Sequence, residues 1–146
     1  MPQAIARMRR DDPTLQNSIF WVVGSTAIFN HMALINRLAG RVPVLSAVPD
    51  LVTAGEDSAA LAIGTTFEDD GYLAATYGAA ILSHRAQPGD LKVGEVSPPD
   101  IAISFLKTHE IGLRIPFEFF EDANRVYDPQ GRLATTDAAA THSTGP

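Results

Sequence analysis

The sequence predicts an α/β fold in which helices flank a Rossmann-like parallel sheet. Along residues 1–127, short apolar runs such as "SIFWVV", "VPVLS" and "ALAIG" alternate with longer amphipathic stretches. Strands that alternate with helices in this way are typical of βαβ units, whose strands are parallel and whose crossovers are right-handed. The chain has 146 residues, of which 45% are hydrophobic and 19% charged. That length and composition suit one domain with a continuous core.

The chain is expected to open with a helix, a strand and a second helix. Residues 2–10 suit a short amphipathic helix, which Pro13 ends because proline cannot continue it. The run "SIFWVV" has the length of a buried strand, and Gly24 terminates it. A single helix is predicted next, with an apolar stripe at helical spacing and a glycine stop. The stripe consists of Ile28, Met32, Ile35 and Ala39, and the stop is Gly40.

The uncharged stretch "NSIFWVVGSTAIFNHMALI" also raises the alternatives of a signal peptide and a membrane span. A signal peptide needs a small-residue cleavage site after its apolar core, and no such site follows. A span would place Asn30 and His31 near the centre of the bilayer, where polar side chains are costly. The strand and helix account for more of the residues, so we expect neither a leader nor an anchor in this stretch.

The middle of the chain predicts two more strands and a long helix. Strands are expected at residues 42–46 and in "ALAIG", with a helical turn in "DLVTAG" between them. The helix begins near Phe67, because Thr65 and Glu68 fit a capping box and acidic residues occupy the first turn. One face of this helix carries only small residues, so we expect it to pack closely against a sheet. Those residues are Gly71, Ala74, Ala75 and Gly78.

The last third of the chain predicts two strands, two short helices and a tail. "LKVGEVS" and "DIAISFL" are expected as strands, and "LKTHEIGLRIP" as one helical turn that ends at Gly112. "FEFFEDANRVY" is expected as a short amphipathic helix. Residues 128–146 lose both periodicity and large apolar side chains, so burial there cannot offset the entropy of ordering. We therefore expect a disordered tail.

Composition argues against several classes of function. The net charge of -6 repels phosphate backbones, so no nucleic-acid partner is expected. The chain has no cysteine, and its four histidines show no ligand spacing, so neither a metal site nor a cofactor is expected. Ser25 and Ser46 lack the G-x-S-x-G context of a serine hydrolase. Glu68, Asp69 and Asp70 suit a magnesium ion or acid-base chemistry, but a helix start already explains them.

Two loops are candidates for binding a ligand. "VVGST" and "AIGTT" each place a glycine and two hydroxyl residues between a strand and a helix. In an open α/β sheet such loops lie at the carboxyl ends of the strands, where ligands bind. Hydroxyl and backbone groups hold a molecule without reacting with it, so no enzyme is predicted. Helix capping explains the same residues equally well. The candidates are Gly24, Ser25, Thr26, Gly64, Thr65 and Thr66.

The order of these segments resembles a known family. "VPVLSAVPDLVTAG", "AIGTTFEDDGYLAATYGAAIL", "AQPGDLKVGEV", "DIAISFLKTHEIGLRIP" and "FFEDANRVYD" follow one another as in the carboxyl-terminal part of ABC-transporter substrate-binding proteins of the tryptophan/tyrosine type. The upstream segment is similar to the family's preceding helix, strand and helix. The resemblance covers roughly residues 1–127, which are incomplete relative to the family. It implies part of a type I periplasmic-binding-protein fold, whose two lobes close on a small solute by hinge motion.

The resemblance also implies a set of ligand-binding residues. The family's cleft-facing loops fall on Gly24, Ser25 and Thr26, on a second loop that includes Pro49 and Asp50, and on Gly64, Thr65 and Thr66 ahead of Phe67. Many relatives carry Asp or Asn in the first of these loops. Gly24 and Ser25 stand there instead, so a ligand contact would use hydroxyl or backbone groups.

Two functions from different classes follow. The first is a solute-binding component of an ABC importer that binds an amino-acid-like solute without catalysis, works with a membrane permease and, by resemblance, lies in the periplasm. The chain would be cytoplasmic if Met1 is the true start. The alternative is a stand-alone flavodoxin-like regulatory or interaction module that self-associates, because a homodimer would cover an exposed sheet edge. A small metal-dependent enzyme that uses Glu68, Asp69 and Asp70 is a third hypothesis.

Overall fold

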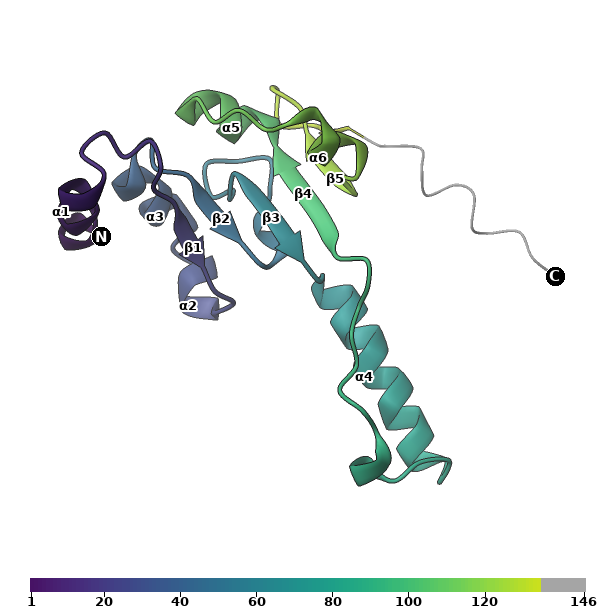
Figure 1. The fold of residues 1–146 in the computed structure, drawn as a ribbon. Helices are drawn as coiled ribbons and strands as arrows, with labels where there is room; N and C mark the ends of the chain where they lie inside the picture. Colours follow the sequence, from purple (N-terminus) through teal and green to yellow (C-terminus); the bar gives the residue numbers. More distant parts are fainter. Residues whose placement is uncertain (135–146) are drawn as a thin grey trace.

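The computed structural model describes residues 1–134, which form one six-stranded sheet with flanking helices (Figure 1). The strands follow the chain order across the sheet: β1 (Phe20–Val22), β2 (Val44–Ser46), β3 (Leu61–Gly64), β4 (Asp100–Ser104), β5 (Arg125–Tyr127) and β6 (Leu133–Ala134). The α-helices are α1 (Pro2–Asp11), α2 (Thr26–Phe29), α3 (Met32–Ala39), α4 (Phe67–Leu82), α5 (Phe105–Ile111) and α6 (Phe117–Glu121). Two 3₁₀ turns are η1 (Pro49–Leu51) and η2 (Pro88–Asp90).

The α/β class and the Rossmann-like βαβ arrangement are confirmed, but the sheet is mixed. Strands β1, β2 and β3 are parallel, as expected. Strand β4 runs antiparallel to β3, and β6 runs antiparallel to β5. The reversal at β4 arises because the chain leaves β3 along α4 and returns to the same end of the sheet, where Gly64 pairs with Asp100. The carboxyl end of the first three strands is therefore also the amino end of β4 and β5.

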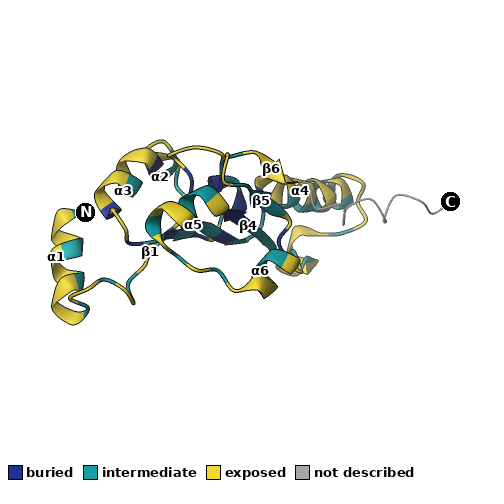
Figure 2. Ribbon diagram, turned by 90° about the horizontal axis from the view of Figure 1, so that it is seen from above, coloured by how far each residue is buried: buried dark blue, intermediate teal, exposed yellow. Residues whose placement is uncertain are grey.

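The core lies between the sheet and the helix and loops that pack on it, and it consists mostly of small aliphatic side chains. Figure 2 shows the buried residues concentrated in the sheet, with the outer surfaces of the helices exposed. Ile103 and Met32 are among the largest fully buried side chains. Buried hydroxyls are paired as well: Ser58 Oγ donates to the carbonyl of Ala59 at 2.7 Å. Satisfied polar groups of this kind avoid the cost of burial without a partner.

The helix expected after β1 is divided into two. Helix α2 ends at Phe29 and α3 begins at Met32. His31 donates its backbone N–H to the carbonyl of Ile28 at 2.9 Å, a tighter i to i−3 bond, and has a φ of −125°, outside the helical range. Asn30 and His31 have weaker helix propensity than Ala27, Met32 and Ala33 on either side, which makes this a favourable place for the break. Gly40 follows α3 at a φ of 63°, which confirms the predicted stop.

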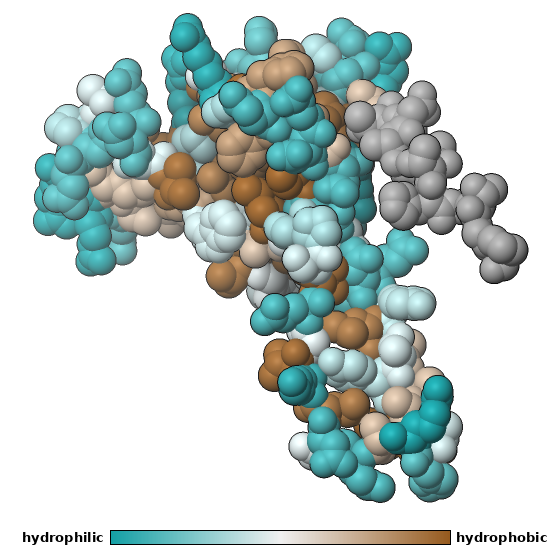
Figure 3. Space-filling model, turned by 45° about the vertical axis from the view of Figure 1, so that its right-hand side comes forward, coloured by the Kyte–Doolittle hydropathy of each residue, from teal (hydrophilic) through white to brown (hydrophobic). Residues whose placement is uncertain are grey.

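Helix α4 projects away from the sheet, so the expected packing of its small-residue face is wrong. None of its residues is buried, and a Cβ at Gly71 or Gly78 would meet nothing within 4 Å. The helix is capped by Thr66, which accepts from the Asp69 N–H at 3.1 Å, so the predicted capping box of Thr65 and Glu68 is displaced by one residue. Figures 1 and 3 show α4 and the returning chain as an arm, with apolar side chains on its surface.

Residues 91–97 run beside α4 and do not form the expected strand. The Tyr77 hydroxyl donates to the Lys92 carbonyl at 3.0 Å. A Cβ at Gly94 would lie 2.5 Å from Leu73 Cδ2, so this glycine lets the returning chain approach the helix closely. The segment "LKVGEVS" thus runs against a helix through Lys92 and Gly94 instead of pairing with a strand, and Val93 remains 93% exposed.

The end of the described chain is more ordered than expected. The residues "RVY", predicted as helix, form β5. Asn124 fixes the approach to β5, because its side-chain oxygen accepts from the Ile101 N–H and its own N–H donates to the Ile101 carbonyl, both at 2.9 Å. Asp128 then closes a turn into β6, so the predicted tail of residues 128–146 is wrong for residues 128–134. The remainder of that tail lies outside the described residues.

The close approach of Gly64 to the loop after β2 yields a stability prediction. A Cβ at Gly64 would lie 1.8 Å from the carbonyl oxygen of Ala47. Relieving this clash requires the backbone to shift, because the oxygen belongs to the main chain. We expect Gly64→Ala to lower the free energy of unfolding by about 3 kcal/mol. Gly78→Ala, in open helical space, should raise it by up to about 1 kcal/mol. Urea denaturation of both variants measures this, and equal stability of the two would contradict it.

Candidate functional site at the carboxyl edge of the parallel strands

The loops that follow β1, β2 and β3 meet at one edge of the sheet. Gly64 lies against the Ala47 carbonyl, and a Cβ at Gly24 would lie 3.6 Å from Val48 Cγ2. The rings of Phe29 and Phe67 contact each other edge to face, with centroids 5.8 Å apart and an interplanar angle of 61°. This contact joins α2 to the first residue of α4. The three loops predicted from the sequence are therefore neighbours.

Asp50 connects three elements at this edge. Its Oδ2 accepts from the Phe67 backbone N–H at 3.0 Å, which satisfies one free donor at the start of α4. Its Oδ1 lies 3.2 Å from Arg125 NH1, at the beginning of β5. The side chains of Asp50 and Arg125 are 31% and 34% exposed, so both groups remain accessible to a solute.

A second acidic pair lies beside this ion pair. Asp69, in the first turn of α4, lies close enough to Asp100, at the start of β4, for each carboxyl to influence the pKa of the other. The hydrogen bond with Thr66 lowers the pKa of Asp69, whereas burial, followed by the interaction with Asp69, raises the pKa of Asp100. As pH falls, Asp100 is therefore the first of the two to take up a proton. The charge of Arg125 acts on both carboxyls.

We call Asp50, Asp69, Asp100 and Arg125 the edge cluster. Its members come from η1, α4, β4 and β5, and the fold brings them together because β4 is antiparallel to β3. The cluster combines carboxyl groups with one guanidinium, so it can bind an ammonium group and a carboxylate on the same molecule. Within residues 1–134 no group of three or more metal-ligating side chains has a geometry that suits a metal ion.

The structure separates the predicted ligand residues into those that face this edge and those with structural roles. Asp50 is in the cluster, and Phe67 is 57% exposed beside it. Pro49 is buried in η1, and Thr66 is buried as the helix cap. Half-buried Ser25 and Thr65 follow β1 and β3 at this edge, and Ser25 does not cap α2 through its side chain. Gly24 and Gly64 give the close approach of the loops, and Thr26 is exposed at the start of α2.

Three members of the edge cluster were not predicted as ligand residues. Asp69 was attributed to helix-start electrostatics, a role it does fill as the partner of Thr66. Asp100 and Arg125 have no sequence signal at this site, because their positions depend on the reversed direction of β4. Phe29 likewise gave no signal beyond helix periodicity. Only long-range strand pairing identifies these residues.

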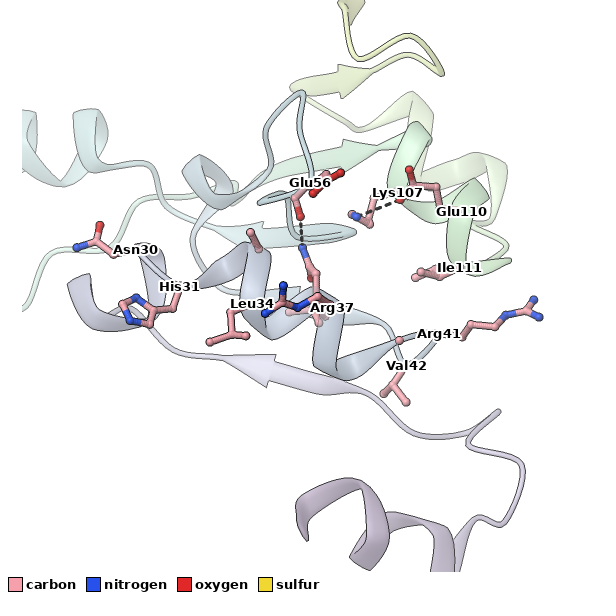
Figure 4. A pocket seen from close by; sticks show the side chains of 14 residues that line it. Asn30, His31, Leu34, Arg37, Arg41, Val42, Glu56, Lys107, Glu110 and Ile111 are labelled. Carbon is pink, nitrogen blue, oxygen red and sulfur yellow. Dashed lines mark hydrogen bonds and ion pairs between the residues drawn. The ribbon is translucent and has the colours of Figure 1, made fainter. Parts of the chain in front are cut away.

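Two hollows of about 670 and 970 Å³ lie elsewhere, and no predicted ligand residue lines either one. The smaller lies between α3, the start of β2 and α5 (Figure 4). There the Asn36 side chain donates to the carbonyls of Glu56 and Ser58, both at 2.7 Å, and Lys107 pairs with Glu110 at 3.0 Å. The predicted loops thus form an open polar edge instead of a hollow shared by Ser25 and Thr65.

Comparison with known proteins gives no match: no family model, no curated protein and no solved structure is similar to this chain. Among the described residues, no helix combines the length and apolarity that crossing a bilayer requires.

The raised pKa of Asp100 predicts a pH-dependent stability difference. A carboxyl whose pKa rises on folding contributes stability at low pH, and this contribution is lost as pH rises through the folded-state pKa. We therefore expect Asp100→Asn to increase the free energy of unfolding at pH 7 relative to the unmodified protein. The gain should vanish near pH ~3.5, where the carboxyl is largely protonated in both states. Urea denaturation at both pH values measures this difference.

Asp90→Asn is the matched control, because Asp90 is exposed in η2 on the arm. It should leave the stability nearly unchanged at both pH values. If Asp100→Asn instead lowers the free energy of unfolding equally at both pH values, the ionised Asp100 carboxylate does not destabilise the fold, and the prediction is wrong.

Proposed function

We propose that the chain is part of a solute-binding protein of an ABC importer and binds an amino-acid-like solute without catalysis. The observation that carries this proposal is the edge cluster, which holds acidic groups and one arginine at the carboxyl edge of parallel strands. Ligands of open α/β sheets commonly bind at this edge. The family resemblance over residues 1–127 supports the same function.

The chemistry of the cluster suits a zwitterion. An ammonium group would bind Asp50 and Asp69, since carboxylates accept charge-assisted hydrogen bonds. A carboxylate would bind Arg125, with hydroxyl groups from Ser25 or Thr65 as further donors. The exposed ring of Phe67, which Phe29 holds edge to face, offers an apolar surface for a side chain. These groups bind and orient a solute, and they provide no activated nucleophile.

The resemblance adds a partner and a location to the proposal. It implies a second lobe that closes over the solute, an ABC permease that receives it, and a periplasmic site of action. In this arrangement the edge cluster forms one wall of the interlobe cleft. The α4 arm, which extends from the same edge, corresponds to the family's return into the first lobe.

A ligand screen tests this proposal. Phe67→Ala is the test variant, and Tyr72→Ala, which also removes an aromatic ring from α4, is its matched control. Titration calorimetry and thermal shift across amino acids and small organic acids should identify a ligand that stabilises the protein, by about 2.7 kcal/mol at 100 times its Kd. Phe67→Ala and Arg125→Ala should each weaken that binding about tenfold or more. Tyr72→Ala, which removes a 78% exposed ring on the same helix, should leave it unchanged.

Thermal unfolding without ligand checks that all these variants fold. Absence of binding by the unmodified protein across the panel counts against the proposal. Binding that Tyr72→Ala weakens as much as Phe67→Ala does would place the solute on the arm instead of at the edge cluster.

A second candidate function is a self-associating, flavodoxin-like interaction module. Strand β1 is an edge strand of the sheet, and its neighbourhood exposes large apolar side chains on one face. Trp21 in β1 is 52% exposed, and Ile19 and Val23, at alternate positions on either side of it, are 51% and 59% exposed. An exposed apolar edge strand is a template for pairing with another chain, so a second copy would cover it.

Sedimentation velocity over a range of concentrations tests self-association through β1. We expect Trp21→Thr to weaken a dimer about tenfold or more, since aromatic residues dominate interface energetics. Leu133→Thr, which changes a 51% exposed residue on the opposite edge strand β6, should have no effect. A monomer at every concentration would rule out this second function.

A further inference from the structure

The larger hollow has a composition that sets it apart from the rest of this acidic chain. It has a volume of about 970 Å³ and lies between α1, the end of α3, residues 40–43 and residues 111–114. Arg9, Arg41 and Arg114 line it, and no aspartate or glutamate does. The chain as a whole has a net charge of -6, so three guanidinium groups without an acid around one hollow are a strong local departure.

The three arginines are not neutralised within the described chain. The ion pairs found in residues 1–134 involve Lys107, Arg125 and Arg132. Asp12 is the carboxylate nearest in sequence to residues 14–16 of the lining. Its oxygens already accept hydrogen bonds from other groups. Asp12 accepts from the Asn17 N–H and the Ser18 hydroxyl, each at 2.8 Å, and from the Thr14 hydroxyl. The guanidinium groups therefore retain their full donor capacity toward an added anion.

Apart from the arginines, Thr14 and Gln16, the residues that line this hollow are apolar. Leu38 is 38% exposed, and Ile5, Leu15, Ile111 and Leu113 contribute further aliphatic surface. In the neighbouring smaller hollow, Figure 4 shows Arg41 directed away from Arg37, beyond Ile111. Arg41 thus lies at the boundary of the two hollows, because it lines both.

We propose that this arginine hollow binds an amphiphilic carboxylate, such as a medium-chain fatty acid. The guanidinium groups provide bidentate donors for the carboxylate, and the aliphatic lining covers the chain. The volume lies within the range of about 300–1,000 Å³ that small-molecule sites occupy. An inorganic anion would leave the apolar surface unused, and a nucleic acid would be repelled by the net negative charge.

This site is independent of the proposed solute site. The arginine hollow includes residues 40–43, which precede β2, and residues 111–114 at and after the end of α5. The edge cluster includes Asp50, which follows β2, and Asp100, which begins β4. The two sites therefore lie at opposite ends of the strands, and substitutions at one leave the other intact.

Calorimetric titration with decanoate, below its micelle concentration, tests the proposal. We expect saturable binding that weakens as salt is raised, and no binding of decanol or of inorganic sulfate at the same concentration. Arg41→Gln combined with Arg114→Gln should weaken decanoate binding about tenfold or more. Arg85→Gln, an exposed arginine on the arm, should leave it unchanged.

Each outcome decides the matter. No saturable binding of decanoate up to about 1 mM, equal binding of decanol, or equal loss in Arg85→Gln overturns the proposal. Binding of an acidic peptide without binding of decanoate also overturns it, in favour of a protein partner. Thermal unfolding shows whether the double variant folds, and the single variants Arg41→Gln and Arg114→Gln provide the test if it does not.

Discussion

The carboxylate of Asp50 fixes the geometry on which the functional edge depends. It accepts from the first N–H of α4 and pairs with Arg125 of β5, so one side chain joins the loop after β2 to two elements that lie beyond it in the sequence. Pro49 and Leu51, the residues on either side of Asp50 in η1, are both buried. These buried neighbours anchor η1, and Asp50 in turn ties the start of α4 to the loop after β2.

The local elements were largely predictable, because they depend on short-range patterns. The run before Gly24 and the run before Gly64 form strands, and Gly112 ends α5 in the left-handed conformation that glycine adopts easily. The failures occurred where long-range contacts decide the outcome. "LKVGEVS" has strand-like residues, yet it packs beside α4, and "RVY" continues a helical pattern, yet it pairs with β4. Hydrophobic periodicity does not specify which surface a segment will cover.

The candidate site divides in the same way. The loops with Gly64 and Asp50 were predictable from their position after strands, since parallel strands end at a common edge. The cluster itself needed the pairing of Gly64 with Asp100, which only the antiparallel entry of β4 provides. Thr66 illustrates the remaining ambiguity of hydroxyl residues: it was predicted as a ligand residue, and it caps α4. A sequence pattern that suits both capping and binding is resolved only by the direction of the side chain.

The arm explains why the edge is left open. Helices in proteins gain most of their stability from tertiary packing, yet α4, with 16 residues, has no buried residue. Its support comes from the Thr66 cap, from acidic residues in its first turn and from Tyr77 and Leu73 against the returning chain. This local support lets α4 extend from the sheet instead of folding back over it. The edge cluster consequently stays accessible, whereas a helix packed across the sheet end would have covered Asp50 and Arg125.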